Sequence, residues 1–334
     1  MIRSSAVKQF FAPVLIFLLA VLLLLRPTAA AAGISEGLLR CAHSMIPALF
    51  PFLVLSEILV QGGYDTSARV LFAPFCHVLR CRTADGGIAL LMGLLGGFTA
   101  GSSALAALLS ENRISKRDAE VMLCACAGIS PAFAVSVVGA SLLRNAALGW
   151  ILFLALVFSS LLCCIAVSLF LPPSYITDPP CLAAPTRKPT FSILFVRAVN
   201  TATQNMLYIC GFVVFFNLLG ALLQTTAFGA SYSAALPLLL ELSAGCHAAC
   251  MRTSDQLIGC LFSMSTLGIC GLTQLRALLP HEISLLPFFL SRIVQFPLAL
   301  WFTKLAMRFL PTIARTTENF SSRLIVTSSL PWEG

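Results

Sequence analysis

The chain has 334 residues, of which 58% are hydrophobic and only 10% charged, with a net charge of +8. A soluble domain carries about 25% charged residues, so this composition excludes an ordinary soluble fold and indicates an integral membrane protein in contact with the lipid bilayer. The basic residues lie between apolar runs, where they set orientation in a membrane, so we expect no nucleic-acid partner.

The 13 cysteines do not have the spacing of a metal site. No Cys-x-x-Cys pair or Cys/His cluster occurs, and a thiol within an apolar run acts as a small hydrophobic group. No pairing of a nucleophile with a base is visible either. We therefore expect no structural disulfide, no metal, no cofactor and no enzymatic activity.

Apolar segments long enough to cross a bilayer follow one another along the chain. They are residues 10–25, 44–62, 86–109, 119–143, 147–171, 201–224, 230–250, 256–279 and 285–309. The first is preceded by Arg3 and Lys8 and followed by "RPTAAAAG", which fits either an uncleaved membrane helix or a signal peptide with a small-residue cleavage site. We prefer the uncleaved helix.

Loop charges indicate that segment 86–109 does not cross. If every segment crosses, five of eleven basic residues lie inside, whereas a hairpin at 86–109 that enters and leaves on the cytoplasmic side puts all eleven inside. The five are Arg3, Lys8, Arg69, Arg80 and Arg82; the other six are Arg113, Lys116, Arg117, Arg187, Lys188 and Arg197. For 230–250 the same argument is weaker, since Arg252 alone follows it, and a second hairpin from the outside keeps the topology consistent.

A weak internal repeat relates the two halves. "FTAGSSALAALL" (98–109) matches "LSAGCHAACMRT" (242–253), and residues 120–143 align with 256–279 without gaps. Upstream, 44–59 pairs with 205–220 and places Ser56 opposite Asn217. Under the hairpin topology the copies are inverted, and inverted repeats with interrupted helices are typical of secondary transporters. Unwound backbone is tolerated in a bilayer only where it is buried or lines a wet cavity.

Four stretches carry a family resemblance: "LFPFLVLSEIL", "GLLGGFTAGSSALAALL" with "ISKRDAE", "CACAGISPAF" and "TLGICGLTQLRALL". Across about residues 40–310 the chain resembles the sporulation integral membrane protein YlbJ family, which carries the nucleoside-recognition Gate domain. Gate-domain proteins are similar to concentrative nucleoside transporters. The resemblance implies an all-α polytopic fold with an inverted repeat, two re-entrant hairpins, two broken helices and a link to spore cortex formation.

The chain departs from the family pattern where ligand chemistry is expected. Family hairpins commonly read Gly-Tyr-Pro-Ser-Gly-Ala-Lys, whereas residues 97–103 read Gly-Phe-Thr-Ala-Gly-Ser-Ser. The family's Asn-Asn-Ser-Gly-Pro break is Ala-Gly-Ile-Ser-Pro at 127–131. Gly96 and Gly101 have the spacing of a phosphate loop, but Ser102 stands where its lysine is required. The backbone plan is retained while its polar groups are reduced.

The expected organisation is an N-terminal membrane helix (1–39), a first Gate-like repeat (40–171), a cytoplasmic linker (172–200), a second repeat (201–310) and a flexible tail (311–334). Candidate solute contacts lie at the two hairpin tips and two helix breaks. They are Gly97, Thr99, Gly101, Ser102, Ser103, Ser130, Pro131, Glu241, Ser243, Gly245, Thr266, Gly268, Gly271 and Gln274. For these small residues the alternative is close helix packing, and for Pro131 an ordinary kink.

Glu57 and Glu241 are the candidates for coupling to a proton or a sodium ion, because a carboxylate within an apolar segment is expensive. Glu241 could instead pair with Arg252 or His247 near the outer surface, and Glu57 could extend to the cytoplasmic interface. Arg292 could form an internal ion pair with Glu241 or Glu57, or lie at shallow depth.

Two functions remain open. The first is a sporulation-type protein of the bacterial cell membrane whose transporter-like scaffold moves a small polar or nucleoside-like solute. The alternative is a non-transporting membrane scaffold in spore envelope formation. The sequence leaves the oligomeric state undetermined.

Overall fold

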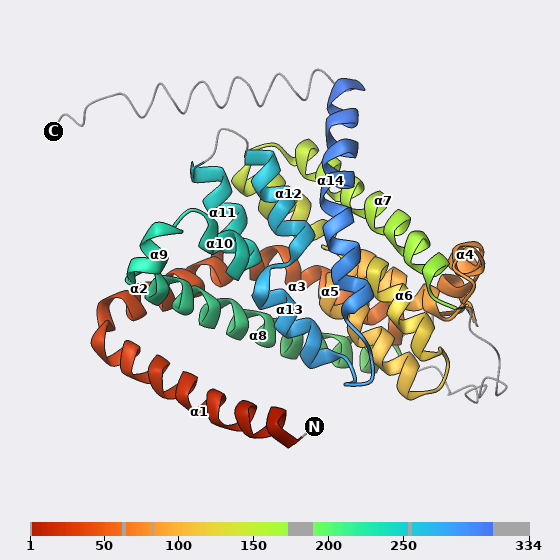
Figure 1. The fold of residues 1–334 in the computed structure, drawn as a ribbon. Coiled ribbons are helices and arrows are strands. Elements are labelled where there is room, and N and C mark those ends of the chain that lie inside the picture. Colours follow the sequence, from red (N-terminus) through yellow and green to blue (C-terminus); the bar gives the residue numbers. More distant parts are fainter. Residues whose placement is uncertain (1, 62–64, 82, 173–189, 253–255, 310–334) are drawn as a thin grey trace.

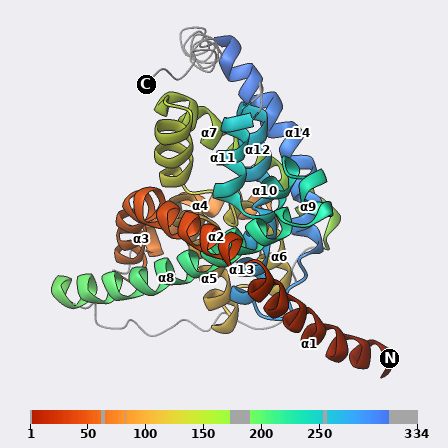
Figure 2. The ribbon, with the colours of Figure 1, turned by 90° about the vertical axis from the view of Figure 1, so that its left-hand side faces the viewer.

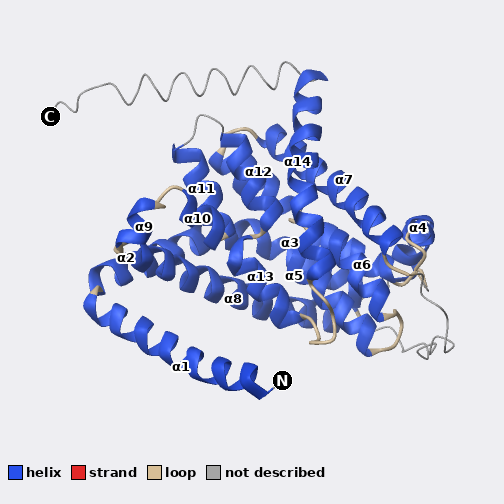
Figure 3. Ribbon diagram, viewed as in Figure 1, coloured by secondary structure: helices blue, strands red, loops and turns tan. Residues whose placement is uncertain are grey.

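The computed structural model describes residues 2–61, 65–81, 83–172, 190–252 and 256–309, which form helices and no strand (Figure 3). The predicted tail at 311–334 lies outside these residues. Six described helical stretches are long and apolar enough to cross a membrane, so the multi-pass, all-helical architecture is confirmed at this level. They are Pro27–Leu59, Gly86–Ser110, Ala146–Phe170, Phe191–Gln224, Gln256–Leu278 and Leu286–Phe309.

The chain begins with α1 (Ile2–Leu25), followed by α2 (Pro27–Arg40), the short π-helix η1 (Cys41–Met45) and α3 (Ile46–Gln61). Helix α2 was not among the predicted segments. Pro27 is favourable at a first helical position, and the alanines that follow are strong helix formers, so the chain re-enters a helix directly after the Arg26 junction.

Helix α8 (Phe191–Gln224) has 34 residues and runs antiparallel to α2 and α3 (Figures 1 and 2). Gly33 packs against Ala221, and Gly37 packs against Val214, so closely that a Cβ on either glycine would lie within 2.8 Å of its neighbour. Small residues permit such backbone approach in membrane helices. Helix α8 starts before the predicted residue 201, so the predicted linker at 172–200 includes its first turns.

Helix α4 (Asp65–Val78) leads to α5 (Gly86–Ser110), which is not straight. Gly97 interrupts α5 with φ 80° and ψ −169°, and a Cβ on Gly101 would lie 2.8 Å from the Gly93 Cα. Those two residues would be about 12 Å apart along a continuous helix. The chain therefore reverses at Gly97, and residues 86–110 form what we call the first hairpin.

Residues 235–252 reverse in the same way and form the second hairpin. Its arms are α10 (Ala235–Leu240) and α11 (Leu242–Arg252), joined by the extended residue Glu241. A Cβ on Gly245 would lie 3.0 Å from the Leu238 Cα, which places the arms against each other. The short helix α9 (Ala227–Ser231) precedes this hairpin.

Two further helices are interrupted, as predicted for residues 119–143 and 256–279. The first consists of α6 (Lys116–Cys126) and the π-helix η2 (Ala132–Leu142). The second consists of α12 (Gln256–Thr266) and α13 (Gly268–Leu278), with Leu267 in the left-handed conformation at φ 63°. We call these the first and second broken helices. Helices α7 (Ala146–Phe170) and α14 (Leu286–Phe309) pack beside them.

Candidate functional site

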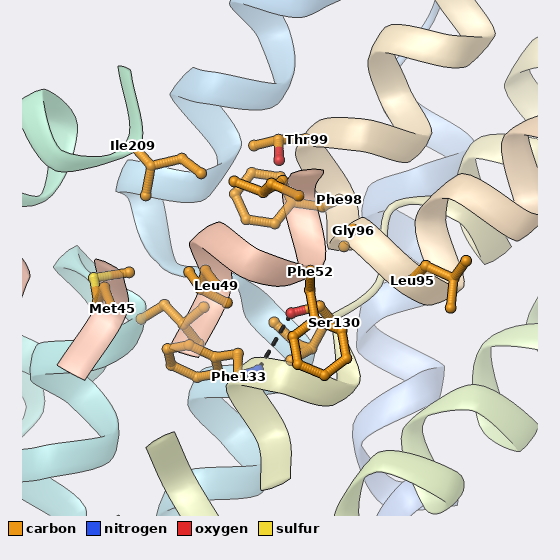
Figure 4. Close-up of a pocket in the computed structure, with 14 residues that line it drawn as sticks. Met45, Leu49, Phe52, Leu95, Gly96, Phe98, Thr99, Ser130, Phe133 and Ile209 are labelled. Carbon is orange, nitrogen blue, oxygen red and sulfur yellow. Dashed lines mark hydrogen bonds between the residues drawn. The ribbon is translucent and has the colours of Figure 1, made fainter. Parts of the chain in front are cut away.

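The tip of the first hairpin packs against the break of the first broken helix. A Cβ on Gly97 would lie 3.2 Å from the backbone nitrogen of Ser130, and the positive φ of Gly97 also disfavours any other residue. Glycine is therefore required here for both conformation and space. Figure 4 shows Ser130 close to the hairpin residues Gly96 and Phe98.

Ser130 and Pro131 restart the broken helix. The Ser130 Oγ accepts a hydrogen bond from the Phe133 backbone N–H at 3.3 Å, as a helix-capping serine does. Pro131 follows at a position where no backbone donor is needed. Ser130 is buried, so this local cap holds the start of η2 in place beneath the hairpin tip.

A cavity of about 50 Å³, which we call the tip cavity, lies between these elements (Figure 4). Its wall includes Gly97 and Thr99 from the first hairpin, Ser130 from the break, and Leu242 from the second hairpin. Helices α3 and α8 complete it with Phe52 and Ile209, among others. Its lining side chains contain two hydroxyls, those of Thr99 and Ser130, and no charge. A volume of this size accommodates a few waters, well below the roughly 300 Å³ of a typical ligand pocket.

Glu241 lies at the tip of the second hairpin with 2% of its surface exposed. Its carboxylate accepts hydrogen bonds from the Ser243 N–H at 2.9 Å, the Ser243 hydroxyl at 2.6 Å and the Ala244 N–H at 2.7 Å. A carboxylate is favourable at a helix N-terminus, so Glu241 caps α11. The side chain of Arg252 lies outside the described part of the chain.

The second tip packs against the second break. A Cβ on Gly268, at φ 64°, would lie 3.1 Å from the Leu240 carbonyl oxygen. Gly271 faces the first hairpin instead, because a Cβ on Gly271 would lie 3.8 Å from the Cζ of Phe98. The two hairpin tips and two breaks thus meet in one region of the fold.

The remaining predicted contacts pack these elements and do not line the tip cavity. A Cβ on Gly101 would lie 2.4 Å from the Cys126 carbonyl oxygen, and one on Gly245 would lie 2.5 Å from the Ser263 Oγ. Gln274 donates to the Cys270 Sγ at 3.3 Å, and Thr266 donates to the Phe262 carbonyl at 3.0 Å. Ser102 is fully buried and Ser103 is partly buried in the same hairpin arm as Gly101.

Glu57 links α3 to α8, because its carboxylate accepts a hydrogen bond from the Asn205 Nδ2 at 3.4 Å. For Arg292 the predicted ion pair with Glu241 or Glu57 is wrong. Arg292 is 5% exposed, and it donates to the Cys124 carbonyl at 2.7 Å and to Gln295 rather than to Glu57 or Glu241. Cys124 is in the last turn of α6, where unpaired carbonyls and the helix dipole attract a cation.

Two polar arrangements were not predicted. The first is a clamp at the base of the first hairpin, where Asp85 lies between Arg69 and Arg113. The second is a cleft of about 330 Å³ between α2, α8 and the second hairpin, lined in part by Glu36 and Arg40. The four-residue spacing of Glu36 and Arg40 in an alanine-rich segment is the sequence signal that could have indicated a helix there.

No family model and no solved structure matches the chain. It is 32% identical over 126 residues to the sporulation integral membrane protein YlbJ of Bacillus subtilis (strain 168). The match covers 38% of this chain and 31% of the relative, so the chain spans about a third of that relative's length. The predicted resemblance is confirmed by this match.

Proposed function

We propose that this chain, which the match relates to the sporulation integral membrane protein YlbJ family, is a carrier for a small polar solute. The match and the six candidate spans support its place as a multi-pass protein of the cell membrane in a sporulating bacterium. The observation that carries the proposal is the convergence of both hairpin tips and the first helix break on the tip cavity.

The register of the interruptions supports the internal repeat, whose copies are inverted under the hairpin topology. The tip residues Gly97 and Glu241 are 144 positions apart, the offset that relates Gly101 to Gly245. Pro131 and Leu267, at the two breaks, are 136 positions apart. These are the two offsets of the sequence repeat, and paired breaks of this kind mark solute sites in secondary transporters.

The contacts at the first tip suggest how such a carrier would work. Gly97 meets Ser130 through close van der Waals approach, and the tip cavity beside them is small. Movement of the tip away from the break would expose the Thr99 and Ser130 hydroxyls to one side of the membrane. A nucleoside-sized solute requires that opening, because the cavity of about 50 Å³ is too small for it. Coupling to a proton or a sodium ion through Glu57 or Glu241 is part of the proposal.

Uptake into proteoliposomes containing the purified full-length protein tests transport, with nucleosides and other small polar solutes as substrates. Saturable uptake is expected, and Gly97→Leu should abolish it because the side chain would collide with Ser130. Gly211→Leu is the matched control, since a Cβ on Gly211 meets nothing within 4 Å. Absence of saturable uptake of every solute by folded protein would reject the carrier function.

A non-transporting scaffold is the second candidate, and the sparse chemistry of the tip cavity favours it. Only two hydroxyls face that cavity, and no charged side chain lines it. Under this alternative the Gly97→Leu protein, if it reaches the membrane at normal levels, would still support spore formation. Spore counts of a strain carrying that variant therefore separate the two candidates.

A further inference from the structure

The cleft between α2, α8 and the second hairpin differs from the tip cavity in size and in charge. Its volume is about 330 Å³, which falls within the range of small-molecule sites. Its polar lining comes from all three elements. It consists of Glu36, Arg40, Asn217, Gln224, Glu241 and His247.

Arg40 lines this cleft, and one of its donors has no partner in the described part of the chain. Its Nη2 pairs with the Glu36 carboxylate one helical turn earlier, and 16% of the Arg40 side chain is exposed. Its Nη1 is buried and has no hydrogen-bond partner among the described residues. An unpaired buried donor costs free energy, which an acceptor from outside the chain would recover. Carboxylate and phosphate oxygens are the acceptors that an arginine prefers.

Glu241 supplies the opposite charge in the lining of the cleft. The hydrogen bonds to its carboxylate come from neutral N–H and O–H groups of residues 243 and 244, so its negative charge is solvated but not neutralised by them. With Glu36 included, the carboxylates of the lining outnumber the guanidinium by one. A solute with its own positive group would balance that difference.

We infer that this cleft binds a small zwitterionic solute, one that carries a carboxylate or phosphate together with an ammonium group. The anionic group pairs with the Arg40 guanidinium, and the ammonium lies toward Glu241. The inference goes beyond the carrier function, because a cleft of this kind can bind a solute whether or not the protein transports it.

Equilibrium binding to the purified full-length protein in nanodiscs of phosphatidylglycerol tests the inference. The probes are radiolabelled glycine, β-alanine and γ-aminobutyrate, whose charges are separated by increasing lengths. At least one should bind saturably. Its uncharged analogue, with an amide in place of the carboxylate and a hydroxyl in place of the ammonium, should not bind. If none of the three binds, the inference is overturned.

Two variants then locate the binding. Arg40→Gln should weaken it roughly tenfold or more, the usual effect of losing a hydrogen bond to a charged group. Ala248→Phe fills the cleft without changing a charge and should also abolish binding. Arg308→Gln, an exposed arginine in the last turn of α14, is the matched control and should leave binding unchanged.

Unchanged binding in both folded cleft variants would overturn the inference, since it would locate the solute elsewhere. A zwitterionic lipid headgroup has the same chemistry as the proposed solute. If phosphatidylethanolamine in the nanodisc displaces the probe at all concentrations tested, the occupant is that headgroup, and a site for a free solute is rejected.

Discussion

The Oδ2 of Asp85 and the Nε of Arg113 are 3.0 Å apart, although these residues lie at opposite ends of the 25-residue helix α5. A straight helix of that length would separate its ends by about 37 Å. The contact therefore requires the reversal at Gly97. Each arm alone therefore covers only about half of the roughly 30 Å hydrocarbon core, although the 25 residues together have the length and apolar composition of a span.

Removing the Asp85 carboxylate should loosen the base of this hairpin. Asp85 is 4% exposed and contacts both Arg69 and Arg113, so Asp85→Asn leaves two arginines facing each other. We expect a loss of about 1–3 kcal/mol in the free energy of unfolding, since both arginines retain some contact with solvent. Denaturant titration of the protein in detergent measures this loss.

Glu111→Gln provides the comparison for that clamp. The Glu111 side chain is 56% exposed and its carboxylate lies 3.4 Å from Arg113. An exposed ion pair contributes little, so the change should stay within about 0.5 kcal/mol. Equal effects of the two substitutions would contradict a clamp centred on Asp85.

Gly101→Ala should destabilise the contact between the first hairpin and α6. The new methyl group would lie 2.4 Å from the Cys126 carbonyl oxygen, and this neighbour is backbone that cannot rotate away. We expect a cost of about 1–3 kcal/mol, typical of overpacking. Gly211→Ala meets open space and should be neutral or slightly stabilising, because alanine favours the helix. Thermal unfolding of both proteins in the same detergent tests the difference.

Arg292→Met should destabilise the first broken helix. The substitution removes the donor to the Cys124 carbonyl and the stacking of the guanidinium over the Phe288 ring, 4.3 Å from its centre. The unpaired carbonyl at the end of α6 then costs about 1–3 kcal/mol. Arg308→Met, at an exposed position in the same helix, should have no comparable effect. A stable Arg292→Met protein with unchanged uptake would remove any role for this arginine at the break.

The topology can be tested by labelling single cysteines in a cysteine-free background. The Glu120 carboxylate accepts a hydrogen bond from the Ser284 N–H at 2.9 Å, so the start of α6 and the turn before α14 lie at one end of the fold. Cysteines replacing Lys116 and Ser284 should therefore react from the same side, the cytoplasm. A cysteine replacing Arg144, beyond the first broken helix, should react from the outside. External labelling at position 116 would contradict the hairpin topology.

The sequence by itself determined the membrane class, most of the spans and the interruptions. A chain with only 10% charged residues cannot cover so many apolar residues with a polar surface, and the loop charges indicated that residues 86–109 form a hairpin. Glycine and proline marked the breaks because their effects on the backbone are local. Gly97 can adopt a φ near +80°, and Pro131 lacks a backbone N–H, whatever residues pack around them.

Only the tertiary structure decided which polar groups meet. Arg40 and Glu241 are about 200 residues apart in the chain, and whether they line one cleft depends on how α2 packs against α8 through Gly33 and Gly37. Arg292 likewise binds the Cys124 carbonyl at the end of α6 and, among the described residues, no carboxylate. Local patterns specify conformation, but the partner of a buried charge is set by long-range packing, which local patterns in a single sequence do not reveal.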